Sequence, residues 1–79
     1  MKYMIELFNF STNRYITCTP ADTMLQVVRV WLKTIEMQKL YNKMHENAKT
    51  GINVYKNGHY MPQNEMFEYI EHNIRLGGE

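Results

Sequence analysis

The sequence predicts a small α+β domain built as β-hairpin, long helix, β-hairpin and C-terminal helix (ββαββα). Three observations lead to this fold class: period-2 hydrophobicity near the N-terminus, a long stretch of helical periodicity in the middle, and an Asn57-Gly58 dipeptide between two apolar runs. The chain has 79 residues, a length typical of one domain. We therefore expect a single domain over residues 1–79, with a flexible tail at 76–79.

The first hairpin is predicted from alternating hydrophobicity. In residues 2–10 the side chains alternate between two faces, with Tyr3 and Ile5 on the same one. Residues 11–13 have the composition of a turn, and residues 14–19 are rich in residues that favour strands. These two runs are expected to pair as neighbouring antiparallel strands.

A long helix is predicted from about Pro20 to about Lys49. Thr19 can cap its first turn, and Pro20 suits the first helical position. Asp22 favours the positive end of the helix dipole. At the other end, Gly51 is the expected stop.

The apolar residues of this helix change face part-way along it. At 100° per residue, the apolar positions around Trp31 point about 160° away from those around Leu40. Two interpretations follow: either two helices meet near Glu36, or one helix of about 28 residues buries opposite faces at its two ends. In the second case the C-terminal half needs a cover, either the last third of the chain or a second subunit.

The second hairpin is predicted from its turn. Asn57-Gly58 is typical of a type I′ turn, because both central residues of that turn need a positive φ. This turn would pair Lys56 with His59 and Tyr55 with Tyr60.

The last predicted element is a helix near the C-terminus. Asn64 can cap it, and the spacing of Met66, Ile70 and Ile74 places these three side chains on one buried stripe. Gly77-Gly78 is expected to end it.

Composition and charge argue against several classes of function. The net charge is +1, which argues against a general nucleic-acid polycation and against a membrane-surface protein. No apolar run approaches 18 residues, so no transmembrane helix is predicted. The single cysteine, Cys18, cannot form an internal disulfide, which points to a reducing, cytoplasmic location.

Residues that could carry chemistry are sparse. Glu68 and His72 share a helix face and could supply two metal ligands, whereas a stable zinc site needs three or four. The alternative for this pair is an ordinary surface contact between residues four apart. Cys18 falls in a short strand, where a small buried thiol is the ordinary reading. We therefore expect no enzymatic activity, no metal site and no cofactor.

Two groups of side chains are candidates for docking on a partner. The first is an apolar group on the changed face of the long helix, and it contains two of the seven methionines, a residue type that adapts to binding surfaces. The alternative is that this group packs on the apolar stripe of the last helix. The second is a pair of tyrosines facing each other across the second hairpin. The partner-binding candidates are Met37, Leu40, Tyr41, Met44, Tyr55 and Tyr60.

These features together predict a small, non-catalytic, cytoplasmic binding or regulatory protein. It would dock on a partner protein, either a host factor or a second copy in a homodimer, and it would have no membrane partner. Small single-domain chains without a catalytic signature are typical of phages and mobile elements. In that setting they serve as accessory proteins or as inhibitors of a host factor.

The stretch GINVYKNGHYMPQNEMFEYIEHN, together with the helix before it, resembles the second half of excisionase-type winged-helix domains. The resemblance implies a DNA-binding regulator in which the break near Glu36 is the turn of a helix-turn-helix. Helix 37–49 would then enter the DNA groove and the 52–61 hairpin would form the wing. The nucleic-acid-binding residues so implied are Lys39, Asn42, Lys43, Lys49, Lys56 and His59.

The tail YIEHNIRLGGE is similar to the C-terminus of prokaryotic ubiquitin-like tags, and RYITCTPADTMLQVVRVWL is similar to the strand-to-helix entry of a ubiquitin-like β-grasp. The first resemblance implies conjugation through Glu79. The alternative reading of Gly77-Gly78 is a plain helix stop.

Overall fold

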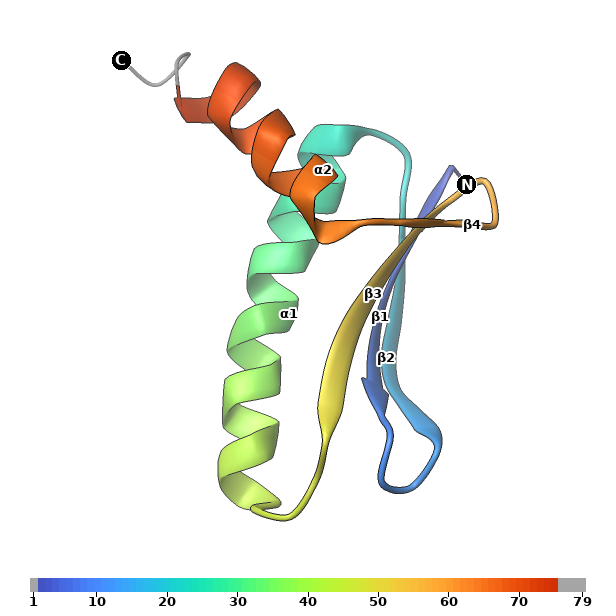
Figure 1. The fold of residues 1–79 in the computed structure, drawn as a ribbon, viewed down its shortest axis with the longest axis vertical. Coiled ribbons are helices and arrows are strands. Elements are labelled where there is room, and N and C mark those ends of the chain that lie inside the picture. Colours follow the sequence, from blue (N-terminus) through green and yellow to red (C-terminus); the bar gives the residue numbers. More distant parts are fainter. Residues whose placement is uncertain (1, 76–79) are drawn as a thin grey trace.

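The computed structural model describes residues 2–75, with side chains described for residues 2–72. Four antiparallel strands form one sheet in the order β2-β1-β3-β4, and the long helix α1 lies along one face of it (Figure 1). This confirms the predicted α+β class and the order ββαββα. The elements are β1 (Tyr3–Asn9), β2 (Arg14–Ala21), α1 (Met24–Met44), β3 (Thr50–Lys56), β4 (His59–Met61), α2 (Gln63–Tyr69) and a π-helical segment, η1 (Ile70–Arg75).

The alternation of β1 explains which face of the sheet receives the helix. β1 lies between β2 and β3, and its odd-numbered residues from Tyr3 to Asn9 are buried on the side of α1. Its even-numbered residues from Met4 to Phe8 are half-buried on the opposite side. The predicted pairing of the first two strands is confirmed, with Tyr3 opposite Ala21.

A β-bulge interrupts the pairing of β1 with β2. Leu7 lies opposite Thr17 and Phe8 lies opposite Tyr15, which leaves Ile16 as an extra residue on β2. A bulge of this kind bends the strand and increases its twist locally. Beyond the bulge, the ladder from residue 17 to residue 21 is regular.

The predicted helix start at Pro20 is wrong. Thr19 and Pro20 belong to β2, where they lie opposite Ile5 and Met4. β2 is an edge strand, and an edge strand tolerates proline because not all of its N–H groups are needed for pairing. The pairing with β1 therefore outweighs the local preference for a helix start.

The helix begins instead after a capping box at Thr23. The Gln26 N–H donates to Thr23 Oγ1 at 3.2 Å, and Gln26 Oε1 accepts from the Thr23 N–H at 3.3 Å. Gln26 Oε1 also accepts from the Asp22 N–H at 2.8 Å. These bonds satisfy backbone donors that the first helical turn leaves free.

We expect Thr23→Ala to lower the free energy of unfolding by about 1 kcal/mol, because it removes the side-chain acceptor of the cap. Thr23→Ser keeps the hydroxyl and should change the free energy of unfolding by no more than about 0.3 kcal/mol. Urea unfolding followed by far-UV circular dichroism measures both. Equal losses in the two variants would contradict this role of the hydroxyl.

Helix α1 is continuous, so the interpretation with two helices meeting near Glu36 is wrong. It ends at Met44 rather than near Lys49, and the His45 N–H closes it by donating to the Tyr41 carbonyl at 2.9 Å. The predicted stop, Gly51, lies in β3 instead.

The second half of α1 does not bury the face opposite to the first half. Its sheet-facing side chains are polar and find partners on β3. Gln38 Nε2 donates to the Thr50 carbonyl at 3.2 Å and to Thr50 Oγ1 at 3.1 Å, and Thr50 Oγ1 donates to Asn42 Oδ1 at 2.9 Å. One face of the helix therefore meets the sheet along its whole length, with apolar contacts at one end and polar contacts at the other.

The hydrophobic core lies between the sheet and the first half of α1, and α2 closes it. Met66 of α2 is fully buried in this core, and the Trp31 and Phe67 rings meet edge to face at 5.5 Å between centroids. The core residues are Tyr3, Ile5, Ala21, Val27, Val28, Trp31, Val54, Met61 and Met66.

The last helix starts earlier than predicted. Pro62 occupies the N-cap position of α2 and Asn64 is its second residue, so the predicted cap by Asn64 is wrong. An extended proline directly after β4 leaves no room for a separate capping residue. Met66 is buried and Ile70 is half-buried, as predicted for this stripe. The Ile74 side chain and residues 76–79 lie outside the described part of the chain.

The second hairpin has the predicted geometry. Asn57 and Gly58 have φ values of 51° and 82°. Lys56 lies opposite His59 and Tyr55 lies opposite Tyr60, as the type I′ turn predicts.

Candidate protein-docking surfaces

The predicted partner-binding residues separate onto two surfaces on opposite sides of the sheet. The first surface, here called the α1–β2 groove, holds four of them beside two residues of the sheet. It is a hollow of about 190 Å³ lined by Leu7, Ile16, Met37, Leu40, Tyr41 and Met44. The second surface, here called the open face, is the sheet face turned away from α1. Its main side chains are Glu6, Phe8, Tyr15, Cys18, Tyr55 and Tyr60.

The apolar side chains of the α1–β2 groove are exposed. Met37, Leu40 and Met44 are 45%, 61% and 72% exposed. Met66 of the last helix packs into the core instead of covering them. The alternative in which this group packs on the stripe of the last helix is therefore wrong for the described residues.

Tyr41 forms the polar end of the groove. Its hydroxyl accepts a hydrogen bond from Asn9 Nδ2 at 2.9 Å. Asn9 is buried, and its Oδ1 accepts from the backbone N–H groups of Ser11 and Thr12 at 2.9 and 3.2 Å. Asn9 thus ties the first hairpin turn to the end of α1. Sequence reasoning missed this residue, although an asparagine just before a turn is a recognised signal.

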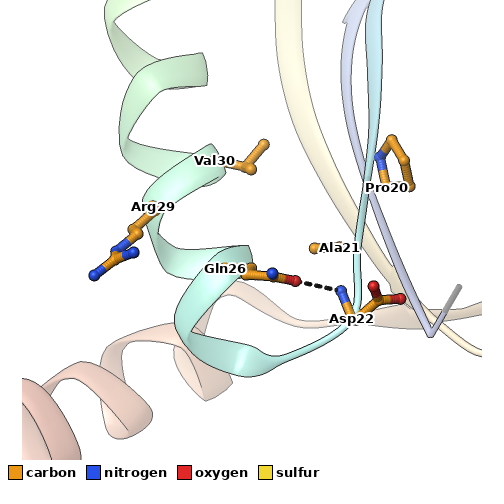
Figure 2. A pocket seen from close by; sticks show the side chains of 6 residues that line it. All are labelled: Pro20, Ala21, Asp22, Gln26, Arg29 and Val30. Carbon is orange, nitrogen blue, oxygen red and sulfur yellow. Dashed lines mark hydrogen bonds between the residues drawn. The ribbon is translucent and has the colours of Figure 1, made fainter.

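A second hollow lies further along the same side of α1, next to the end of β2 (Figure 2). It has a volume of about 380 Å³. Figure 2 shows Val30 pointing toward β2 and Arg29 pointing away from it. The space between α1 and β2 is therefore hollowed at both ends of the helix, near Ala21 and near Ile16.

The aromatic rings of the open face touch one another in two groups. The Phe8 ring meets Phe10 and Tyr15 edge to face at centroid distances of 5.0 and 4.9 Å. The Tyr55 and Tyr60 rings meet at 6.1 Å. Such edge-to-face pairs hold the rings in defined orientations. The two phenylalanines were missed, although they share the even-numbered side of residues 2–10.

Gly51 brings Phe10 onto this face. Gly51 lies opposite Phe8, and a Cβ built on it would lie 2.7 Å from Phe10 Cε2. The Phe10 ring therefore covers the backbone of β3 where a side chain would otherwise stand. This contact, rather than a helix stop, explains the glycine.

One carboxylate lies in the middle of the open face. Glu6 is flanked by Cys18 on β2 and by Asn53 on β3. Burial raises the pKa of the Glu6 carboxyl. Burial and the charge of Glu6 raise the pKa of the Cys18 thiol. Burial, Glu6 and the neighbouring tyrosines raise the pKa of Tyr55. The open face is therefore an environment that disfavours negative charge.

Cys18 is exposed on this face, so the reading of a buried thiol is wrong. Its position opposite Glu6 puts it on the outward side of β2. A raised pKa keeps the thiol protonated at neutral pH, and the protonated form is a poor nucleophile.

We expect Glu6→Gln to raise the free energy of unfolding at neutral pH. The raised pKa of Glu6 means that the folded protein holds this proton more tightly than the unfolded chain does. The associated stability is present below the unfolded pKa and is lost as the pH rises through the folded pKa. Urea unfolding across this range should show the difference between variant and wild type growing with pH. Glu46→Gln, at an exposed position, is the control, and a difference that grows toward acid pH would contradict the prediction.

The residues implied for DNA binding lie near the two opposite ends of β3. Gln38 and Asn42 bond to Thr50, which places the end of α1 beside the start of β3. Lys56, at the other end of β3, lies roughly 20 Å away at the usual rise per residue. Asn42 faces the sheet rather than a groove of DNA. At the Thr50 end are Lys39, Asn42, Lys43 and Lys49, and at the far end are Lys56 and His59.

The helix-turn-helix that the winged-helix resemblance implies is not formed. α1 has no turn near Glu36, and the 52–61 hairpin is part of the four-stranded sheet through the pairing of β3 with β1. The similarity to ubiquitin-like tags rests on a tail whose last residues, 76–79, are outside the described chain.

Glu68 and His72 are both exposed at the end of the chain. Within residues 2–75, no group of three His, Cys, Asp or Glu side chains is placed to hold a metal ion. In the same part of the chain, no helix combines the length and the hydrophobicity needed to cross a membrane.

No protein-family model, curated protein or solved structure matches this chain. The functional reading therefore rests on the two surfaces themselves.

Proposed function

We propose that this protein is a non-catalytic binding protein that docks on a partner protein through the open face. The observation that carries the proposal is the aromatic surface of a sheet that α1 covers on the other side only (Figure 1). Tyrosine and other aromatic side chains are enriched at protein interfaces and often supply most of the binding energy. Strands hold these rings more rigidly than loops would, which lowers the entropic cost of binding.

The shape of the open face also favours a partner. A hollow of about 430 Å³ lies between the first two strands and the second hairpin, and Glu6, Tyr15 and Tyr55 line it. Tyr15 is 61% exposed, and Tyr60, which lies opposite Tyr55, is 58% exposed. A side chain of the partner could enter this hollow while the exposed rings pack around it.

The charge of the open face favours a protein over a nucleic acid. Glu6 is the one charged residue that the strand register places on this face among the described residues, although Lys2 lies at the rim of the hollow. A carboxylate in the centre repels phosphate, whereas nucleic-acid-binding faces combine aromatic rings with a basic groove. A partner that brings apolar side chains around one Lys or Arg would satisfy both the rings and Glu6. Docking of this kind would act by blocking or redirecting the partner.

Affinity capture with a matched pair of variants tests the proposal. Wild-type protein, Tyr60→Asp and Leu32→Asp would be immobilised and exposed to extract of the native host, with and without nuclease treatment. Tyr60 and Leu32 are similarly exposed, at 58% and 51%, but Leu32 lies on α1, away from the open face. We expect a protein retained by wild type and Leu32→Asp and lost with Tyr60→Asp.

The captured protein would then be purified and its affinity measured. Tyr15→Ala and Tyr60→Ala should each weaken binding by roughly tenfold or more, as for interface anchors. Equal retention by all three proteins in the capture step would rule out the open face as the docking site. Retention that disappears with nuclease treatment would instead indicate a nucleic-acid ligand.

A further inference from the structure

We propose that two copies of the chain pair edge to edge through β2, which joins their sheets into one and covers the α1–β2 groove. This inference concerns a different surface from the open face and does not depend on the proposed function. The occupant of the groove would be a second copy of the same chain, related to the first by a two-fold axis.

The two edges of the sheet are unequal. β4 has three residues, and short edge strands resist unwanted pairing. β2 has eight residues, and its segment from Tyr15 to Ala21 contains no charged side chain. Natural edge strands are usually protected by charges, prolines or bulges.

The protection that β2 does have lies toward its ends. Arg14 and the bulge at Ile16 are at one end, and Pro20 is near the other. The regular segment Thr17–Thr19 between them has β-branched residues and an unpaired outer edge. A second extended backbone can take the place of water at this row of donors and acceptors. An antiparallel pairing of this segment with itself is isologous and closes after two copies.

The geometry of the sheet places the second copy over the groove. α1 contacts β1, β2 and β3, which centres it on β1. Pairing through β2 separates the two β1 strands by three strand spacings, or roughly 14 Å. The axes of the two α1 helices would then lie about 14 Å apart, whereas directly packed helices lie roughly 8–10 Å apart.

The apolar side chains beside β2 suit that extra width. Met37, Leu40 and Met44 project from the side of α1 that borders the groove, together with Ile16 from β2. Long, adaptable methionine side chains from both copies can fill the space between the helices. Because the two β2 strands run in opposite directions, the α1–β2 groove of each copy would be covered by the opposite end of β2 and α1 of the other copy, around the hollow near Pro20.

Sedimentation equilibrium of the full chain over a range of concentrations tests the proposal. We expect a mass that rises from one chain to two. Leu40→Glu should return the mass to that of a single chain, whereas Leu32→Glu should not. Leu32 is 51% exposed on the same helix, but it points about 80° away from Leu40 and about 140° away from Met37. Thr17→Lys adds a charge to the edge strand itself and should also give a single chain.

Amide hydrogen exchange supplies a residue-level readout on wild-type protein. Exchange in the segment Thr17–Thr19 should slow as the concentration rises, while exchange in β4 should not change. Circular dichroism at near-ultraviolet wavelengths confirms that each variant is folded. If a variant unfolds, the exchange measurement on wild type still decides the proposal.

The proposal would be overturned by a single-chain mass at all concentrations, by equal dissociation with Leu32→Glu and Leu40→Glu, or by concentration-dependent protection in β4 instead of β2. Tyr60→Asp should leave the mass unchanged. A dimer that Tyr60→Asp dissociates would show self-association through the open face and would also overturn the pairing through β2. Failure of the dimer leaves the capture experiment on the open face unaffected, so the two proposals can fail separately.

Discussion

Trp31→Ala is expected to lower the free energy of unfolding by about 3–5 kcal/mol. Trp31 is 5% exposed and lies where α1, the sheet and α2 meet. Its ring also meets the Phe67 ring edge to face. Alanine would leave a large cavity at this junction and release α2 from α1. Since small domains have total stabilities of roughly 5 kcal/mol, much of the protein should be unfolded at room temperature.

Urea unfolding followed by far-UV circular dichroism measures this effect. Leu32→Ala is the matched control, because Leu32 is the next residue on the same helix and is 51% exposed. It should change the stability by about 0.5 kcal/mol or less. Similar losses in both variants would mean that the core does not lie on the Trp31 side of α1.

Asn9→Ala is expected to lower the free energy of unfolding by about 1–3 kcal/mol. Asn9 is 3% exposed and joins the hydroxyl of Tyr41 to the backbone N–H groups of Ser11 and Thr12. Alanine removes all three hydrogen bonds and leaves their partners without this acceptor or donor. The first hairpin turn should also become less ordered, since two of the bonds hold it.

Tyr41→Phe isolates one of these bonds. It removes the acceptor of Asn9 Nδ2 and leaves the turn intact, so we expect a smaller loss of about 1 kcal/mol. Amide exchange at Ser11 and Thr12 should speed up in Asn9→Ala and stay unchanged in Tyr41→Phe. A larger loss in Tyr41→Phe than in Asn9→Ala would contradict the central role of Asn9.

Local signals predicted the second hairpin well because its turn admits few alternatives. Asn57 and Gly58 both take a positive φ, and this fixes the pairing of Tyr55 with Tyr60. The start of α1 was predicted less well because two signals lie close together. Pro20 looks like a first helical residue, while the Thr23 and Gln26 pair is the capping box that is used. Pairing with β1 decides between them, and that pairing is not visible locally.

The polarity of α1 shows a different limit of sequence reasoning. The apolar residues of its second half, Met37 and Leu40 among them, suggested a face that needs a cover, either the last third of the chain or a second subunit. Gln38 and Asn42 face the sheet instead, because Thr50 offers them hydrogen-bond partners. Hydrophobicity alone therefore does not identify the face of this half of α1 that meets the sheet. The hydrogen-bonding partner of that face, Thr50, lies later in the chain, on β3.

The two docking surfaces could be predicted only in part. The partnership of Tyr55 and Tyr60 follows from the hairpin, but both sides of β1 are apolar, with Leu7 on one and Phe8 on the other. The alternation therefore predicts two faces without showing which one α1 covers. The groove beside β2 depends on the strand order, which the sequence does not encode in any short motif.

The central position of β1 has a consequence for how the chain folds. Its pairing with β3 joins residues 41 to 53 positions apart, from Asn9–Thr50 to Tyr3–Lys56. Closing such a long loop has an entropic cost that only the finished sheet offsets, so topology of this kind slows folding. During synthesis, the first hairpin and α1 leave the ribosome before β3 does, so the four-stranded sheet cannot form until β3 has emerged. The sheet should therefore complete only after β3 has been made.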